Sequence, residues 1–316
     1  ELVSLEKFKT AVESAGNYLF EGSAGDLGKI KNKLYSTEKQ SVEINRLGQY
    51  KEHWVWANGI YSKGMFHPMD ETGIVQLREK EHDTHYFIPV MGSTTAQDND
   101  DLRNYRRFIH KPTDTGFAQW CNLMISVYGD NAKTGIAFAL FAMYSDIVFE
   151  VTHGAPMLFL FGQRSSGKGT FATSLLSLFG MPQDQIMLGG QSTVVGFMRK
   201  MSQFSNAIVW LDEYKNDIDP KKIESLKNIW DRVGYERGVK DQSNRTQSTP
   251  ITSSAILSGQ EVPNGEPALF SRTILLGFKN KQYSADEISS FNRLRQIEQS
   301  GLTTATHTAI SHRELV

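Results

Sequence analysis

Residues 158 to 180, LFLFGQRSSGKGTFATSLLSLFG, have the pattern of a buried strand, a glycine-bounded loop and an amphipathic helix. Gly162 and the pair Gly167-Lys168 have the spacing of a phosphate-binding loop, in which backbone N–H groups and a helix N-terminus face an anion. Gly169 stands where a Ser or Thr usually follows the lysine, and Thr170 comes one place later. This stretch therefore predicts a strand, loop and helix unit that holds a phosphate group.

Each part of the loop has an expected task. Backbone N–H groups of residues 163 to 168 are expected to surround a β-phosphate, while the Lys168 ammonium reaches the β- and γ-phosphates. Thr170, on the first helical turn, is expected to give its hydroxyl to Mg²⁺ in place of the usual residue. The predicted nucleotide-binding residues are Gly162, Gln163, Arg164, Ser165, Ser166, Gly167, Lys168, Gly169 and Thr170.

The chain from residue 157 onward alternates short apolar runs with helical patterns. Four runs are candidate core strands: MLFLF (157–161), AIVWL (207–211), SSAILS (253–258) and TILLGF (273–278). Such alternation favours an α/β fold with a mostly parallel sheet flanked by helices. In that architecture ligands bind at the carboxyl ends of the strands, which is where the loop at Gly162 begins.

The second apolar run ends in two carboxylates, Asp212 and Glu213. Asp212 is expected to hold Mg²⁺, mostly through water, and Glu213 to polarise a water molecule that attacks the γ-phosphate. The loop order Gly-Lys-Gly-Thr is also similar to that of adenylate-kinase-type enzymes, so a nucleoside monophosphate kinase is an alternative. A kinase must avoid attack by water, and the second carboxylate therefore favours an ATPase.

Two further residues extend the predicted catalytic set. Gln260 ends the third apolar run, where it can orient the attacking water, although Glu261 or Ser258 can lie nearer. Arg272 begins the fourth run, from which it does not easily reach the phosphates of its own chain. In a ring of subunits, this arginine would neutralise charge on the γ-phosphate of a neighbouring site. A surface ion pair is the alternative role for Arg272.

Composition narrows the class of protein. With 316 residues, 39% of them apolar, and a net charge of −1, the chain is expected to be soluble and globular, and any nucleic-acid contact must come from a local basic patch. Cys121 is the single cysteine, which excludes an internal disulfide and suits a reducing cytoplasm. No apolar run approaches the roughly 20 residues of a spanning helix, so we expect no membrane role.

The remaining patterns divide the chain into predicted segments. The first residue is Glu1 rather than Met, so we expect a segment of a longer protein. Helical spacing predicts a helix over about residues 1–25, and Ser284 followed by Glu287 predicts a helix N-terminus. The four segments are a small α+β accessory module (1–100), a helical collar or linker (101–150), the ATPase core (151–280) and a C-terminal helical lid (281–316).

The order of these motifs resembles that of the AAA+ ATPases. The phosphate loop, WLDE (210–213), a polar strand end and ALFSR (268–272) are similar to superfamily 3 and minichromosome-maintenance-like helicases, over about residues 115–316. MLFLFGQRSSGKGT after a long apolar helix resembles the primase-helicases of phages, poxviruses and mobile elements. This resemblance implies a P-loop (AAA+) fold, ATP and Mg²⁺, a homo-hexameric ring acting in DNA replication, and a possible primase domain or partner.

The same resemblance implies a contact with single-stranded or forked DNA. Those helicases carry a hairpin before their third core strand, and the matching stretch here is YERGVKDQSNRTQSTP (235–250). Lys240 and Arg245 flank its polar turn, where they would meet phosphates. A solvated loop is the alternative for this segment. For the whole chain, the alternative within the family is an AAA+ nucleotide switch or loader that binds DNA or a partner without unwinding.

Overall fold

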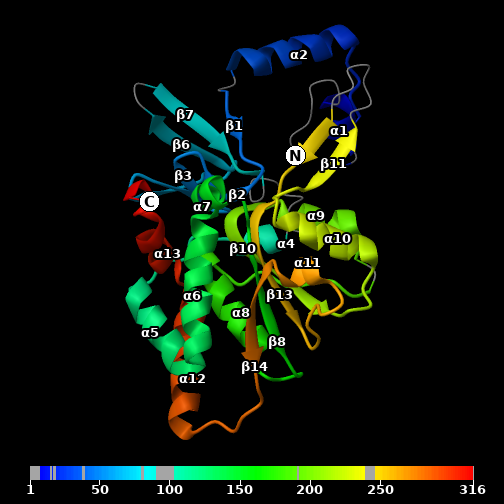
Figure 1. Ribbon diagram of the computed structural model, residues 1–316. Helices are drawn as coiled ribbons and strands as arrows, with labels where there is room; N and C mark the ends of the chain where they lie inside the picture. Colours follow the sequence, from blue (N-terminus) through cyan, green and yellow to red (C-terminus); the bar gives the residue numbers. More distant parts are fainter. Residues whose placement is uncertain are drawn as a thin grey trace.

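The computed structural model describes residues 8–14, 16, 19–37, 40–79, 82–89, 103–190, 192–238 and 246–315 (Figure 1). Its centre is a nine-stranded sheet whose main path runs in the order β14-β8-β13-β10-β2-β3-β4-β5. Helices cover this sheet, and the strand ends near the phosphate loop point toward the lower part of the view.

The four predicted core strands are all present. They are β8 (Met157–Gly162), β10 (Phe204–Tyr214), β13 (Thr252–Gly259) and β14 (Thr273–Phe278). All three pairings among them are parallel. Parallel strands covered on both faces need continuous apolar runs, and β8 and β13 are accordingly buried along nearly their whole length. The parallel order brings the carboxyl ends of β8, β10 and β13 to one edge of the sheet.

Strands from the N-terminal part of the chain continue this sheet. They are β2 (Leu47–Tyr50), β3 (His53–Trp56), β4 (Gly59–Ser62) and β5 (Met65–Pro68), joined as antiparallel hairpins. β2 pairs in parallel with the start of β10 through two residues, and the two-residue β9 (Ile186–Met187) pairs with β10 farther along. Trp54 and Trp56 are buried in the same core as Phe179. The division of the chain at residue 100 stays a prediction, but sheet and core are continuous across it.

A second, three-stranded sheet and two helices lie at the N-terminal end. The sheet has the order β1 (Val42–Glu43), β7 (His82–Phe87), β6 (Ile74–Glu79). Of the helix predicted over 1–25, the described residues include α1 (Phe8–Ser14), and a second helix, α2 (Ala24–Thr37), begins near its predicted end. Ser23 explains the separate start of α2, because Ser23 and Asp26 cap each other through backbone and side-chain hydrogen bonds.

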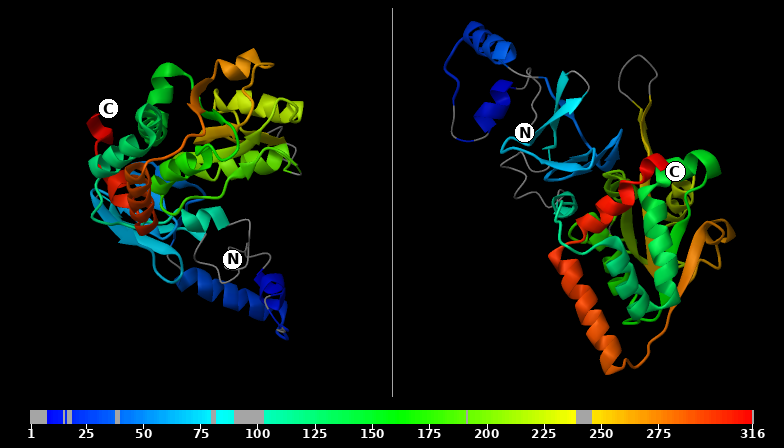
Figure 2. Two further views of the ribbon diagram at one scale, coloured as in Figure 1. Left: turned by 90° about the horizontal axis from the view of Figure 1, so that it is seen from below. Right: turned by 90° about the vertical axis from the view of Figure 1, so that its left-hand side faces the viewer.

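The remaining helices surround the main sheet (Figure 2). α5 packs against α6 and α12, and α13 packs against α5 and α6. The capping pair predicted at the start of α12 is confirmed, because Ser284 and Glu287 form a capping box. The elements are α4 (Arg103–Arg107), α5 (Phe117–Tyr128), α6 (Asp130–Met143), α7 (Ser145–Thr152), α8 (Lys168–Leu176), η4 (Ser177–Phe179), α9 (Val194–Met201), α10 (Pro220–Ile229), α11 (Pro267–Phe270), α12 (Ala285–Ser300), α13 (Thr303–Ile310) and η5 (Arg313–Leu315).

The length and apolarity of the described helices can be compared with those of a helix that spans a membrane. Within the described part of the chain, no single helix is both long and apolar enough to cross a bilayer. Only α6 and α7 taken together pass by length and composition, and they are bent by 88° relative to each other.

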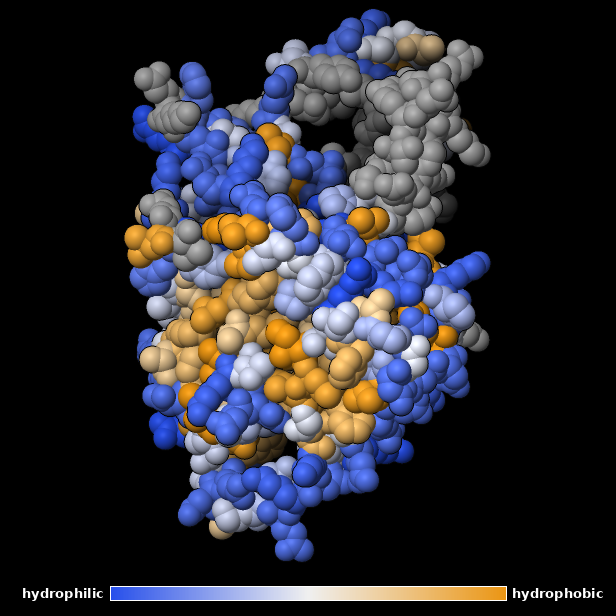
Figure 3. Space-filling view, viewed as in Figure 1, coloured by the Kyte–Doolittle hydropathy of each residue, from blue (hydrophilic) through white to orange (hydrophobic). Residues whose placement is uncertain are grey.

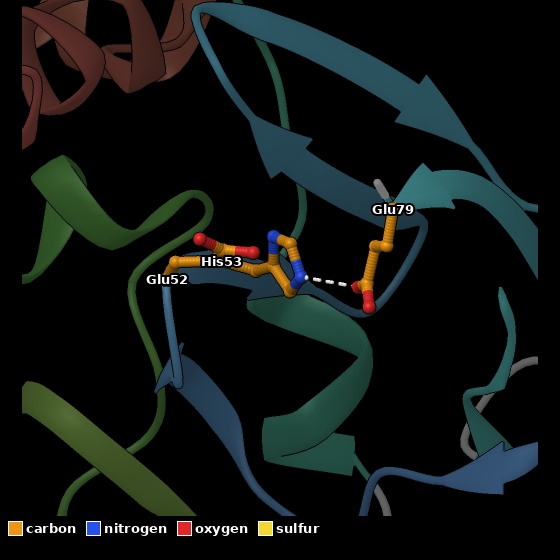
Figure 4. Close-up of side chains that lie close together, drawn as sticks. All are labelled: Glu52, His53 and Glu79. Carbon is orange, nitrogen blue, oxygen red and sulfur yellow. Dashed lines mark hydrogen bonds and ion pairs between the residues drawn. The ribbon is translucent and has the colours of Figure 1, made fainter. Parts of the chain in front are cut away.

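A buried polar network joins the two sheets (Figure 4). His53 Nε2 lies 2.9 Å from Glu79 Oε1, and its Nδ1 lies 2.9 Å from the Ser62 hydroxyl. The Tyr86 hydroxyl also donates to Glu79 Oε1, at 2.5 Å, and this bond is the largest cause lowering the pKa of Glu79. Glu52 lies close enough to complete a set of possible metal ligands. Because His53 and Glu79 already satisfy each other, we interpret the group as a structural link between β3 and the β6–β7 hairpin.

Glu298 gives the fold an expected pH dependence. Its carboxyl group is buried between α12 and α8, and burial raises its pKa to about 7. A raised pKa means that the folded state holds this proton more tightly than the unfolded state, so its contribution to the free energy of unfolding is lost as pH rises from about 4.5 through 7. Glu298→Gln is therefore expected to stabilise the protein at pH 8, by at most about 3 kcal/mol, and to change stability little at pH 5.

Denaturant unfolding of the parent and of Glu298→Gln at both pH values measures this difference. An equal change at pH 5 and pH 8 would show that the carboxyl group is ionised in the folded protein, against the expectation.

Candidate nucleotide-binding site

A pocket of about 1310 Å³ lies at the carboxyl ends of β8, β10 and β13. Most of the predicted site residues line it, although they are separated by up to 96 positions in the sequence, from Arg164 to Gln260. The structure thus brings the phosphate loop, the acid pair and the third strand end to one place. The predicted residues in its wall are Arg164, Ser165, Ser166, Gly167, Lys168, Gly169, Thr170, Asp212, Glu213 and Gln260.

The loop between β8 and α8 has the backbone that its sequence predicts. Gly167 has φ of +96°, a left-handed conformation that glycine adopts readily, and α8 begins directly after it at Lys168. At Gly162, an added Cβ would lie 2.4 Å from the carbonyl oxygen of Phe278, so only glycine fits beside β14. These two glycines shape the turn that directs the N-terminus of α8 into the pocket.

The loop also holds polar groups that suit an anion. The Lys168 ammonium donates to the carbonyl oxygens of Gly162 at 2.6 Å and Gln163 at 2.7 Å, so it lies over the loop. Burial lowers the pKa of Lys168, and the charge of Asp212 opposes that shift. Ser166 is only 4% exposed, and its hydroxyl makes no hydrogen bond within the described chain. A buried hydroxyl without a partner, next to a lysine and a helix N-terminus, fits the binding of a phosphate.

Thr170 lines the pocket on the first turn of α8, and its role as a magnesium ligand stays a prediction. Its hydroxyl donates to the carbonyl oxygen of Gly167 at 2.7 Å on the first turn of α8, at the pocket wall. Gly169 contacts the Trp210 ring, because an added Cβ there would lie 3.3 Å from Cη2 of the indole. A side chain at position 169 would crowd this indole, and the hydroxyl on this turn of α8 comes from Thr170, one residue later.

The acid pair lies at the end of β10, and its two carboxylates differ in setting. Asp212 is partly buried, and its Oδ1 accepts a hydrogen bond of 2.5 Å from the Ser258 hydroxyl. Glu213 is exposed and has φ of +61°, at a register shift between β10 and β13. Non-glycine residues rarely adopt this conformation, and such strain is common at functional sites. The irregularity lets adjacent residues of one strand both face the pocket.

Ser258, Gln260 and Glu261, the three candidates for orienting water near the end of β13, differ in their contacts. Ser258 is the one that bonds to Asp212. Gln260 is exposed and lines the pocket, while Glu261 accepts a hydrogen bond of 2.9 Å from the backbone N–H of Asn216. A role for Gln260 in hydrolysis stays a prediction. Ser258 is fixed in the site by its contacts, and only its place near the strand end pointed to it in the sequence.

Arg272 lies away from its own chain's loop. β14 runs parallel to β8 with Thr273 opposite Met157 and Phe278 opposite Gly162, so Arg272 is at the other end of the strand. At about 3.3 Å per residue, this separation is on the order of 20 Å. Arg272 Nη1 donates to the carbonyl oxygen of Lys227 at 2.7 Å, and the side chain remains 29% exposed. Its Nη2 also lies 3.9 Å from Asp231 Oδ2, so the ion pair named as the alternative role is present, and a role in a neighbouring subunit's site stays a prediction.

The predicted DNA-contacting segment is described in part. β11 (Tyr235–Gly238) and β12 (Thr246–Thr249) pair as an antiparallel hairpin that projects from the body of the molecule (Figure 2). Lys240 and Arg245 lie outside the described residues. The pairing of β11 with β12 agrees with the hairpin that the resemblance implied, and the contact of its tip with DNA stays a prediction.

The pocket has a further wall that the sequence did not predict. The connection from β14 to α12 and the first turns of α12 contribute Lys279, Lys281, Tyr283, Ile288 and Phe291, and the corner between α5 and α6 contributes Tyr128 and Asn131. No motif marks these residues, because they come together only through the packing of α12 against α5. Their mixture of aromatic, apolar and basic side chains suits the base and sugar of a nucleotide.

Comparisons with known proteins give distant likenesses. No protein-family model and no curated protein matches the chain. A solved structure described as "SCCmec type IV Cch - active helicase" is 14% identical with a TM-score of 0.48, over 99% of this chain and 55% of that one. JCV helicase is 17% identical with a TM-score of 0.35, over 64% and 61%, and the NrS-1 C terminal region is 11% identical with 0.38, over 91% and 62%.

The chain thus spans 55% to 62% of the length of these three solved structures. The identities and TM-scores are too low to argue for an activity, so the function of this chain has to be argued from its site.

Proposed function

We propose that this chain is an ATP-hydrolysing DNA helicase motor of the AAA+ type, from the replication system of a phage or mobile element. The observation that carries the proposal is the pocket whose wall contains Lys168, Thr170, Asp212 and Glu213. Lys168 and the loop N–H groups would bind the phosphates, and Thr170 and Asp212 would supply oxygen ligands of the kind that Mg²⁺ prefers. Bound Mg²⁺ would neutralise charge on the phosphates, while Glu213 accepts a proton from the attacking water.

Hydrolysis is favoured over transfer to a second nucleotide by the position of Glu213. Glu213 lines the same pocket as Lys168 and is exposed, so water has access to its side chain. A nucleoside monophosphate kinase would place an acceptor nucleotide there and exclude water. Phosphate transfer to a nucleoside monophosphate, at a rate above hydrolysis, would favour that alternative.

We further propose that subunits assemble into a ring, as a homo-hexamer. β14 is at the edge of the sheet, and Phe270, Ile274 and Leu275 beside Arg272 are 38% to 45% exposed. Figure 3 shows apolar side chains gathered on the face that carries α6 and β14. A second subunit on this face would cover them and bring Arg272 toward its site. Light scattering with and without ATP and Mg²⁺ measures the mass of the assembly.

Thr170→Ala tests the metal assignment. The variant loses a hydroxyl at the pocket wall, so we expect a roughly tenfold rise in the Mg²⁺ concentration that half-saturates ATP hydrolysis. Thr173→Ala is a matched control, because Thr173 lies one turn later on α8 and its hydroxyl donates to the carbonyl oxygen of Gly169. An unchanged Mg²⁺ requirement in Thr170→Ala would mean that another group binds the metal.

Arg272→Ala tests whether the site is shared between subunits. We expect hydrolysis to fall at least about tenfold, because the neighbour's γ-phosphate loses a positive charge. Mixing this variant with Glu213→Gln should restore activity, since a hybrid interface joins an intact Arg272 to an intact Glu213. For random mixing in equal amounts, about a quarter of the interfaces are of this kind. Mixtures that stay as inactive as the separate variants would exclude a shared site.

Strand displacement on a forked DNA duplex tests the motor itself. The parent protein is expected to release the displaced strand in the presence of ATP and Mg²⁺, and Lys168→Ala is expected to release none. A nucleotide switch or loader would instead bind the fork and hydrolyse ATP without displacing a strand. That result would overturn the helicase proposal while leaving the ATP site intact.

A further inference from the structure

A chain of hydrogen bonds crosses from β10 to β13 beneath the candidate metal ligands. Trp210 Nε1 donates to the Ser258 hydroxyl at 2.7 Å, and that hydroxyl donates to Asp212 Oδ1 at 2.5 Å. Trp210 and Asp212 are two residues apart on β10, so their side chains lie on the same face of the sheet. Ser258 is 1% exposed, and its hydroxyl is thus held between two fixed partners.

The direction of this chain is set by the chemistry of its members. An indole N–H can only donate, and an ionised carboxylate can only accept. The Ser258 hydroxyl therefore accepts from Trp210 with a lone pair and directs its single proton at Asp212. The bond to a charged acceptor is the stronger of the two, and it leaves the second carboxylate oxygen of Asp212 for a metal or its water.

The same indole also touches the phosphate loop. Cη2 and Cζ2 of Trp210 lie 3.3 and 3.7 Å from the place of a Cβ at Gly169, the residue next to Thr170. The indole ring therefore lies between the first turn of α8, which carries Thr170, and the Ser258 hydroxyl, which is bonded to Asp212. The two expected metal ligands lie on different elements, Thr170 on α8 and Asp212 on β10. The Trp210 side chain lies beside Gly169, the neighbour of Thr170, and it also donates to the hydroxyl that is bonded to Asp212.

We propose that Trp210 and Ser258 are positioning residues that set the distance and orientation of Asp212 relative to Thr170, and so the affinity of the site for Mg²⁺. This inference rests on the proposed ATP site. Gly169 contributes to this arrangement, because the absence of a side chain there lets the Trp210 indole approach α8. Trp210 and Ser258 also line the pocket, and the effect proposed for them is on the binding of the metal.

The test compares Ser258→Ala and Trp210→Phe with the parent. Trp210→Phe keeps an aromatic ring but removes the N–H group, and Ser258→Ala removes the hydroxyl with little change of volume. Ser253→Ala is the matched control, because Ser253 is a buried serine of the same strand whose hydroxyl donates to the carbonyl oxygen of Met201. Binding of a fluorescent ATP analogue is measured at increasing Mg²⁺ concentration, and again without Mg²⁺.

Both variants are expected to need roughly three- to tenfold more Mg²⁺ for half-maximal enhancement of binding, since each weakens a bond that fixes a charged ligand. Binding without Mg²⁺ and the Mg²⁺ requirement of Ser253→Ala should stay at the parent's values. The proposal is overturned if either variant stays within about twofold of the parent's Mg²⁺ requirement, or if Ser253→Ala shifts equally. A parent protein that binds no ATP analogue would instead refute the proposed function.

Discussion

Lys168→Ala is expected to lower ATP hydrolysis by roughly 100- to 1,000-fold, the usual loss when one charged or donating group is removed from a phosphoryl-transfer site. The ammonium lies over the loop, bonded to the carbonyl oxygens of Gly162 and Gln163, within the wall of the pocket. Its removal leaves the phosphates without their main positive partner from this chain. Phosphate release at saturating Mg²⁺ and ATP measures the effect.

The control for Lys168 is Lys221→Ala, an exposed lysine near the start of α10 that does not line the pocket. It should hydrolyse ATP at the parent's rate. If Lys168→Ala did so as well, the loop would not be the site of hydrolysis.

Glu213→Gln is expected to keep ATP binding and to lose hydrolysis by roughly 100-fold or more, because an amide cannot accept the proton of the attacking water. Glutamine has nearly the same shape, so the backbone at φ of +61° and the contacts of β10 should be retained. The variant therefore separates the two functions of the pocket. Single-turnover hydrolysis and ATP binding, measured on the same preparation, give both quantities.

The control for Glu213 is Glu71→Gln, an exposed glutamate in the turn before β6. It is expected to behave like the parent in both measurements. A Glu213→Gln variant with the parent's hydrolysis rate would assign the general base elsewhere, and Glu261 would be the next residue to test because it also lines the pocket.

The parts of the fold that were predictable from sequence are those encoded by local patterns. β8, the loop and α8 follow from one stretch of apolar spacing and glycines, and Asp212 and Glu213 follow from the end of one apolar run. The capping pair Ser284 and Glu287 likewise marks the start of α12 by local chemistry. In each case the residues that decide the structure are neighbours in the chain.

The features that escaped prediction depend on contacts between distant segments. The addition of β2 to β10 rests on two pairs of residues, Leu47 with Phe204 and Gly48 with Ser205, and no local pattern specifies such a pairing. Trp210 had the pattern of an ordinary core residue of a strand. Its contact with Gly169 and its bond to Ser258 appear only when β10, β13 and α8 are packed together.

The central claim is that this pocket binds and hydrolyses ATP with Lys168 and Glu213 in separate roles. The most direct measurement is the identity of the nucleotide that each protein retains after incubation with labelled ATP and Mg²⁺ and rapid removal of free nucleotide. We expect ADP on the parent, intact ATP on Glu213→Gln and no nucleotide on Lys168→Ala. Intact ATP on the parent, or ADP on Lys168→Ala in the parent's amount, would contradict it.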